Sequence, residues 1–363
     1  MKSISKLAIF IAVGFLSFAI FGCGGGSSVA KDTNTTSANY DGALSGGDLV
    51  EATFNPSTKE LTYKVTGAIG GQSGTNGSAK LEKLFGNFYK YPNKDLYFFF
   101  SGSLAVGNLE LNGKDYYTVS LKDAITPTAN DIVGDYNLLV ALSNDNPDIC
   151  KLQLKNENGI NHAIIGPCIS DKAHVFDSQS CAMNKTEMNF AWEIDGKKII
   201  FKDPNTNEIF AQALFKKGTQ KAMVLDILNQ QNSGIGIALE AKELNQNTIP
   251  KSTFSYLDVS DSDDAFGEVT IEKGNFTWKD KKSDGSVEDS GSGSLSYNPD
   301  ILDVCPEVGN WKGLAAVNDP DSPSSDPTEF ALFSIDDGYY FSVSFAQDSD
   351  DFIFSVGSNK PLQ

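Results

Sequence analysis

The chain has 363 residues, of which 40% are hydrophobic, and it carries 29 basic and 47 acidic residues. This apolar content is enough to build packed cores and excludes wholesale disorder, and the length suggests two or three domains. Every basic residue is a lysine, and the net charge of −18 makes the chain repel nucleic acid and anionic lipid headgroups, which excludes nucleic-acid binding as its function.

The first 23 residues have the order of a secretory signal. Two lysines precede an uncharged, mostly apolar run over residues 7–21, and the small residue Gly22 then precedes Cys23. The run is too short for a membrane-spanning helix, which needs about 20 apolar residues. We therefore expect residues 1–22 to be a cleaved signal peptide.

The tetrapeptide Ile-Phe-Gly-Cys at 20–23 resembles the lipobox of bacterial lipoproteins. The resemblance implies that Cys23 becomes the lipidated N-terminus and that acyl chains anchor the protein to a membrane. In that family, aspartate directly after the cysteine favours retention in the inner membrane, whereas this chain has Gly24. The resemblance thus implies a bacterial cell-envelope protein at the outer membrane.

The next residues, 23–38, are rich in Gly, Ser, Thr and Asn, which predicts a flexible lipidated tether. From Tyr40 onward apolar and polar residues alternate with a period of two between turn residues, which indicates half-buried antiparallel strands. The first β module, residues 39–127, includes a hairpin signal at Asn112-Gly113.

Two further β modules follow, over residues 128–246 and 247–363, and the third repeats the plan of the second with low identity. Turn signals spaced by about 8 to 12 residues are typical of small barrels or sandwiches. We therefore predict an all-β fold of two or three tandem antiparallel β modules.

Four cysteines remain after Cys23, an even number that favours two disulfides in an exported chain. They are Cys150, Cys168, Cys181 and Cys305. A zinc site is the alternative, but the chain has no Cys-x-x-Cys pair and two histidines. A hairpin could bring Cys150 to Cys168, and Cys168 to Cys181 is an equally local closure. Either pairing leaves Cys305 with a distant partner.

The third module holds most of the negative charge, with 22 acidic residues and 7 lysines. Its first acidic cluster is a candidate calcium site, because calcium prefers several carboxylate and carbonyl oxygens on one loop. The cluster consists of Asp258, Asp261, Asp263, Asp264 and Glu268. No spacing fits an EF-hand, and solvated loops are the alternative. No other cofactor is indicated.

The sequence indicates no catalytic residue. Nucleophile elbow, zinc-protease, phosphate-loop and dinucleotide motifs are absent, and the two histidines, His162 and His174, flank the cysteine-bearing stretch. We predict a non-catalytic envelope lipoprotein that acts as a binding or adhesion module for a protein or glycan. The alternatives are an envelope assembly or structural component and, because carboxylate pairing is spatial, a β-rich carboxylate-dependent glycosidase.

Overall fold

In the computed structural model, the strands of the chain lie within the unit Thr35–Gln363. The residues it describes are 37–67, 71–142, 148–170, 187–228, 233–247, 249–259, 266–299, 311–318, 329–345 and 352–362. They form three antiparallel sheets, which confirms the all-β prediction and shows that the sheets are barrel-like. Across these stretches, none of the helical structure is long and apolar enough to span a bilayer.

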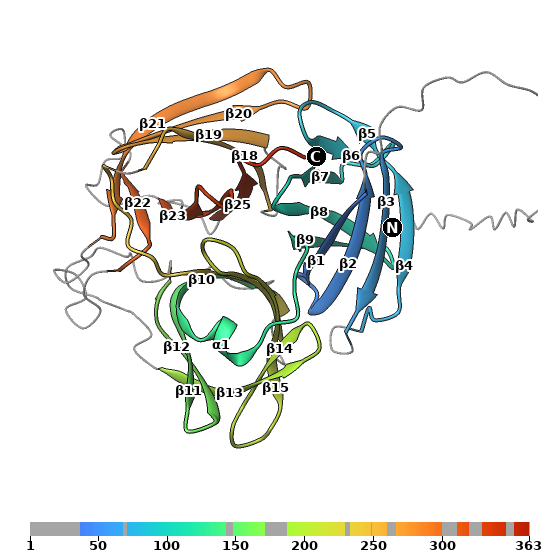
Figure 1. The fold of residues 1–363 in the computed structure, drawn as a ribbon. Coiled ribbons are helices and arrows are strands. Elements are labelled where there is room, and N and C mark those ends of the chain that lie inside the picture. The colour runs from blue at the N-terminus through green and yellow to red at the C-terminus, as the bar shows by residue number, and fades with distance from the viewer. Residues whose placement is uncertain are drawn as a thin grey trace, which may run out of the picture. The chain divides into compact units, whose positions relative to one another are not determined.

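Sheet A has nine strands in the order β4-β3-β2-β1-β9-β8-β7-β6-β5. The strands are β1 (Ala38–Leu44), β2 (Asp48–Asn55), β3 (Glu60–Thr66), β4 (Asn76–Lys80), β5 (Glu82–Lys83), β6 (Phe88–Lys90), β7 (Tyr97–Phe100), β8 (Leu104–Leu111) and β9 (Lys114–Lys122). Only Leu81 separates the edge strands β4 and β5, so one continuous segment pairs with β3 through its first half and with β6 through its end. The sheet therefore curls on itself (Figure 1).

The second sheet, barrel B, is closed by pairing of its first and last strands. Its strands are β10 (Gly134–Leu142), β11 (Asp148–Glu157), β12 (Ile160–Ser170), β13 (Met188–Asp195), β14 (Lys198–Lys202), β15 (Ile209–Lys216), β16 (Ala222–Leu228) and β17 (Ser233–Glu240). The short helix α1 (Ala129–Ile132) precedes β10. At its start the Asp131 carboxylate accepts hydrogen bonds from the Thr128 N–H at 2.9 Å and from Lys217 Nζ at 2.6 Å.

Barrel C is closed in the same way, through β18 and β25. Its strands are β18 (Ser252–Asp258), β19 (Phe266–Glu272), β20 (Asn275–Lys281), β21 (Val287–Tyr297), β22 (Ala315–Asn318), β23 (Glu329–Ser334), β24 (Tyr339–Phe345) and β25 (Phe352–Ser358). Consecutive strands are neighbours throughout, so the connections after β18, β20, β22 and β24 all leave from the same end of the barrel. We call this the acidic end of barrel C, because three of these connections are rich in aspartate in the sequence.

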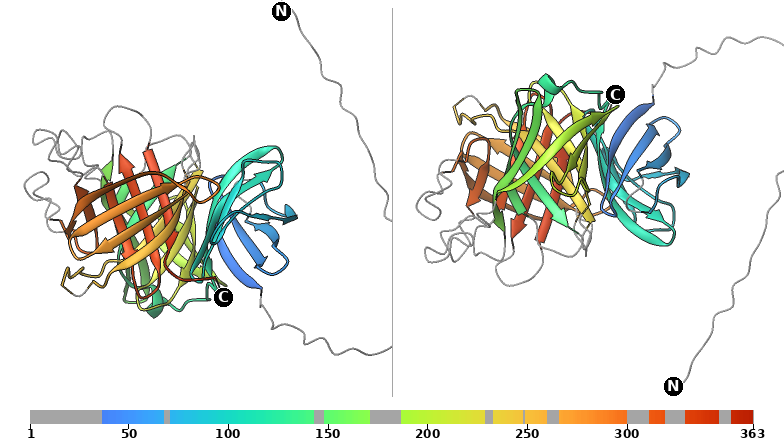
Figure 2. Two further views of the ribbon diagram at one scale, coloured as in Figure 1. Left: turned by 90° about the horizontal axis from the view of Figure 1, so that it is seen from above. Right: turned by 90° about the horizontal axis from the view of Figure 1, so that it is seen from below.

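Side-chain alternation gives each sheet a filled interior and a separate outward face, part of which is apolar. On β16, for example, Met223 and Leu225 belong to the core inside barrel B, whereas Ala222 and Val224 face outward. The outward residues of all three sheets meet in one shared core, and two further views show sheet A beside the barrels (Figure 2). Members of the shared core include Val119 and Leu121 of sheet A, Val224 and Ile237 of barrel B, and Phe341 and Val356 of barrel C.

Paired polar groups fix barrel B against barrel C. Trp311 is fully buried, and its indole N–H donates to Asn137 Oδ1 at 2.7 Å, while Asn137 Nδ2 donates to the Lys312 carbonyl at 2.9 Å. Burying such groups is costly unless they are hydrogen-bonded, so these contacts hold the barrels in one particular arrangement.

Candidate functional site

Two strands of barrel C carry the same inward pattern of an aromatic residue, a second aromatic residue and an acid at alternate positions. The residues are Phe254, Tyr256 and Asp258 on β18, and Phe276, Trp278 and Asp280 on β20. Residues two apart on a strand share a face, so each acid follows its aromatic neighbours toward the barrel interior. The interior therefore changes from apolar to polar toward the acidic end.

The acids are joined to phenols contributed by other strands. The Tyr256 hydroxyl donates to Asp280 Oδ1, and the Tyr340 hydroxyl donates to Glu329 Oε1 at 2.8 Å. The two tyrosine rings have centroids 6.3 Å apart. We call Tyr256, Asp280, Glu329 and Tyr340 the carboxyl–phenol cluster.

Glycines make room for the aromatic members of this end. A Cβ atom on Gly267 would lie 2.0 Å from Cζ of Tyr256, and a Cβ on Gly291 would lie 2.7 Å from the Trp278 ring. Real Cβ atoms do not approach other atoms so closely, so each ring lies across a strand that must carry glycine at that position.

Burial dominates the electrostatics of the cluster. It raises the pKa of the Asp280 carboxyl, the Tyr256 hydrogen bond acts in the opposite direction, and two nearby acids add to the rise. Burial likewise raises the pKa of Glu329, and hydrogen bonds from Ser342 and Tyr340 oppose it. Both carboxyls therefore keep their protons to a higher pH than ordinary carboxyls do.

Further acidic groups surround this end. Asp258 lies at the end of β18, and its Oδ1 accepts a hydrogen bond from Ser355 Oγ. Of the four connections that leave from this end, the three over residues 260–265, 319–328 and 346–351 contain nine aspartates and no lysine in the sequence, and the fourth, residues 282–286, contains Lys282 and Asp284. The first three lie outside the described residues, and the name of the acidic end refers to their sequence content.

The structure describes two members of the predicted calcium cluster and does not bring them together. Asp258 shares the inward face of Tyr256, whereas Glu268 alternates with the inward Val269 and forms an ion pair with Lys281 at 2.6 Å. Asp261, Asp263 and Asp264 lie outside the described residues. Within the stretches that are described, no group of three or more His, Cys, Asp or Glu side chains is placed to hold a metal ion.

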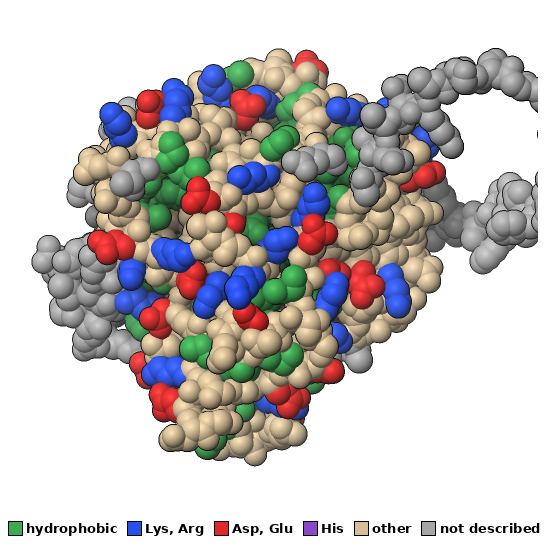
Figure 3. Space-filling view, viewed as in Figure 1, with side chains coloured by type: hydrophobic (Ala, Val, Ile, Leu, Met, Phe, Trp, Pro, Cys, Tyr) green, Lys and Arg blue, Asp and Glu red, His purple; other side chains and the backbone are tan. Residues whose placement is uncertain are grey.

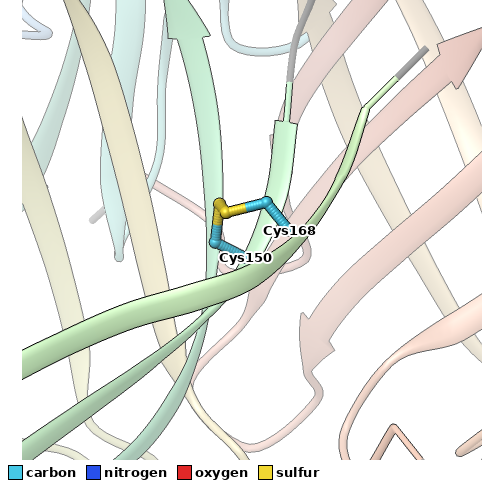
Figure 4. Close-up of a disulfide and its surroundings, with 2 residues drawn as sticks. All are labelled: Cys150 and Cys168. Atoms are coloured by element: carbon cyan, nitrogen blue, oxygen red, sulfur yellow. A yellow bond between two sulfur atoms is a disulfide. The ribbon is translucent and has the colours of Figure 1, made fainter. Parts of the chain in front are cut away.

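Cys150 and Cys168 form a disulfide, which is the first of the two local pairings considered above (Figure 4). They are direct partners across β11 and β12, and both lie in the core of barrel B. Cys23, Cys181 and Cys305 fall outside the described residues, so lipidation and the second disulfide remain predictions.

The carboxyl–phenol cluster was not singled out from the sequence, although a signal for part of it exists. The repeated spacing of two aromatic residues and an acid marks Asp258 and Asp280 on the inner faces of their strands. Nothing comparable marks Glu329, because its partner Tyr340 comes from the next strand. Of the two histidines, His162 lies on β12, where its backbone carbonyl accepts a hydrogen bond from the Trp192 indole N–H at 2.9 Å, and His174 lies outside the described residues.

No protein-family model matches the chain, and no curated protein matches it. Among solved structures, the chain is similar to a double mutant of the vaccine antigen transferrin binding protein B from Haemophilus parasuis, with 10% identity over 90% of this chain and 76% of that one and a TM-score of 0.27. A single mutant of the same antigen gives 10% identity, the same coverage and a TM-score of 0.25. The DNA polymerase III subunit beta from Pseudomonas aeruginosa gives 9% identity over 89% of this chain and 92% of that one, with a TM-score of 0.15. At these TM-scores the likenesses carry no argument about function.

Proposed function

We propose that the protein is a non-catalytic, lipid-anchored protein of the bacterial outer membrane that binds a protein partner through the acidic end of barrel C. The envelope location rests on the signal-like sequence before Cys23. The binding role rests on the acids Asp258, Asp280 and Glu329 at one end of barrel C, together with the aspartate-rich sequence that joins its strands there, and this is the observation that carries the proposal.

The filled barrel interiors favour binding on the surface. Large buried side chains occupy each interior, so a ligand would meet the rims and the loops instead of a central channel. Examples are Phe54 and Phe100 in sheet A, Trp192 and Phe201 in barrel B, and Phe254 and Phe333 in barrel C. Loops displayed by a rigid scaffold commonly carry the binding residues of a protein.

The electrostatics of the cluster argue against a carboxylate-pair glycosidase at this site. Such an enzyme needs one protonated and one ionised carboxyl, so the surroundings must shift the two pKa values apart. Here burial raises the pKa of both Asp280 and Glu329. The two groups therefore act alike, which suits a polar lining better than acid–base chemistry.

The charge distribution favours a partner with a basic surface. Lysine and acidic side chains are mixed over the face shown in Figure 3, whereas three of the four connections at the acidic end contain nine aspartates and no lysine in the sequence. An acidic end steers a basic partner toward it and repels anionic surfaces. A neutral glycan would gain nothing from this field.

Photocross-linking in intact cells tests the proposal. Val287 begins β21, beside the connection from β20 at the acidic end, and is 53% exposed, so a photoreactive amino acid placed there reaches a bound partner without disturbing a core. The matched control is Ile160, which is 61% exposed and begins β12, next to the hairpin turn of barrel B.

We expect a discrete protein adduct from position 287 and none from position 160, with mass spectrometry identifying the partner. A partner from the same envelope would assign an assembly role, and a foreign protein an adhesion role. Equal labelling at the two positions, or none at either, would overturn the proposed binding end. The location is tested by Cys23→Ala, which should leave folding intact and remove the protein from the membrane fraction.

A further inference from the structure

Asp226 on β16 is a buried acid at the contact between barrel B and sheet A. Its exposed fraction is 0%, and neither carboxylate oxygen has a hydrogen-bond partner in the described structure. Ala222 and Val224 on the same strand belong to the shared core, so by alternation the Asp226 side chain also points out of barrel B toward sheet A. An acid placed in this way has no structural reason to be ionised.

The turn between β1 and β2, residues 45–47, lies against this part of barrel B. Ser233, which begins β17, donates from its Oγ to the Ser45 carbonyl at 3.0 Å. Asp48 follows the turn directly, is fully buried, and accepts a hydrogen bond on Oδ2 from the Gln72 N–H at 2.8 Å. The turn and Asp48 thus lie over the strand pair that carries Asp226.

The charges around Asp226 oppose its ionisation on balance. Burial raises its pKa to about 8, the negative charge of Asp48 adds to the rise, and Lys198 on β14 acts against it. The same two sheets are also joined by an ion pair between Lys197 Nζ and Asp41 Oδ2 at 3.0 Å. Lys197 is already engaged by Asp41, so it does not compensate a negative charge on Asp226.

We propose that Asp226 is a proton-dependent latch that controls the packing of turn 45–47 on barrel B. With its proton bound, the carboxyl is neutral and stays buried beneath the turn. When the O–H bond breaks and the proton passes to solvent, a carboxylate is left without a donor in a dry interface. An unpaired buried charge is strongly unfavourable, so the turn moves aside and admits water.

Hydrogen exchange tests the latch in the full folded protein. Protection factors, corrected for the intrinsic effect of pH, are compared at about pH 6 and about pH 9.5, on either side of the expected ionisation. The informative amides are those of Ser45, Gly47 and Gln72, which donate to the carbonyls of Tyr117 and Leu44 and to Asp48 Oδ2. The strands β19 and β20 of barrel C serve as the internal reference.

In the wild type we expect protection of these three amides to fall by about tenfold or more at the higher pH, while the reference strands keep theirs. Asp226→Asn cannot ionise and should abolish the fall. Asp48→Asn removes the repelling charge and should move the transition to lower pH. Asp115→Asn, at an exposed position on β9, should behave as wild type.

Unchanged protection in the wild type, or an equal fall in Asp226→Asn, would overturn the latch. If Asp226→Asn fails to fold, the direction of the shift in Asp48→Asn decides the question, because a latch that does not involve Asp226 would show no downward shift.

Discussion

Replacing Asp226 by asparagine should stabilise the protein, and the gain should grow with pH. In the folded chain the pKa of Asp226 is raised from its ordinary value of 3.8 to about 8. Between these two values the folded state holds a proton that the unfolded state has lost. The free energy of unfolding of the wild type therefore falls as the pH rises through this window and is constant above it.

The magnitude follows from the size of the shift. One pKa unit corresponds to about 1.4 kcal/mol, so the wild type should lose about 4 kcal/mol relative to Asp226→Asn between about pH 4 and pH 7. The fully buried position of Asp226 means that solvent does not reduce this value. Urea unfolding of both proteins at several pH values measures the difference directly. A difference that is the same at every pH would show that Asp226 ionises normally in the folded state and would refute the reasoning.

Three further changes have expected outcomes. Replacing Cys150 and Cys168 together by alanine opens a loop with a sequence separation of 18, and urea unfolding should show a loss of about 3 kcal/mol by the loop-entropy relation; a loss near zero would contradict it. Gly267→Ala forces a Cβ onto a tyrosine ring and should lower the thermal midpoint, at a cost of about 1–3 kcal/mol. Trp311→Phe leaves Asn137 Oδ1 buried without its donor and should cost about 1–3 kcal/mol in urea unfolding, with an unchanged midpoint counting against the paired interface.

The all-β fold could be predicted from the sequence because the evidence for it is local. Alternation with a period of two shows within a few residues, as in Leu61, Tyr63 and Val65 of β3. The closure of two sheets into barrels is not local. It depends on pairing of first and last strands, such as Tyr136 with Glu240 in barrel B and Tyr256 with Gly357 in barrel C. No short stretch of sequence contains that information.

The same difference between local and non-local information applies to the cysteine pairing and to the buried acid Asp226. Sequence spacing left Cys150–Cys168 and Cys168–Cys181 open, and the register of β11 and β12 decides between them. Asp226 stands in the apolar run Ala222–Leu228, which marks it as unusual, but only the packing of sheet A on barrel B shows that its carboxylate is buried.

The most direct test of the binding proposal is the yield of the photocross-link at position 287 after charge reversal beside it. Glu288 and Asp289 are exposed on β21, and changing both to lysine should repel a basic partner while leaving the barrel folded. The control is Glu157→Lys, an exposed reversal on barrel B. We predict that the adduct is lost in the double variant and retained in the control. An undiminished adduct in the double variant would contradict the claim that the acidic end of barrel C recognises its partner by charge.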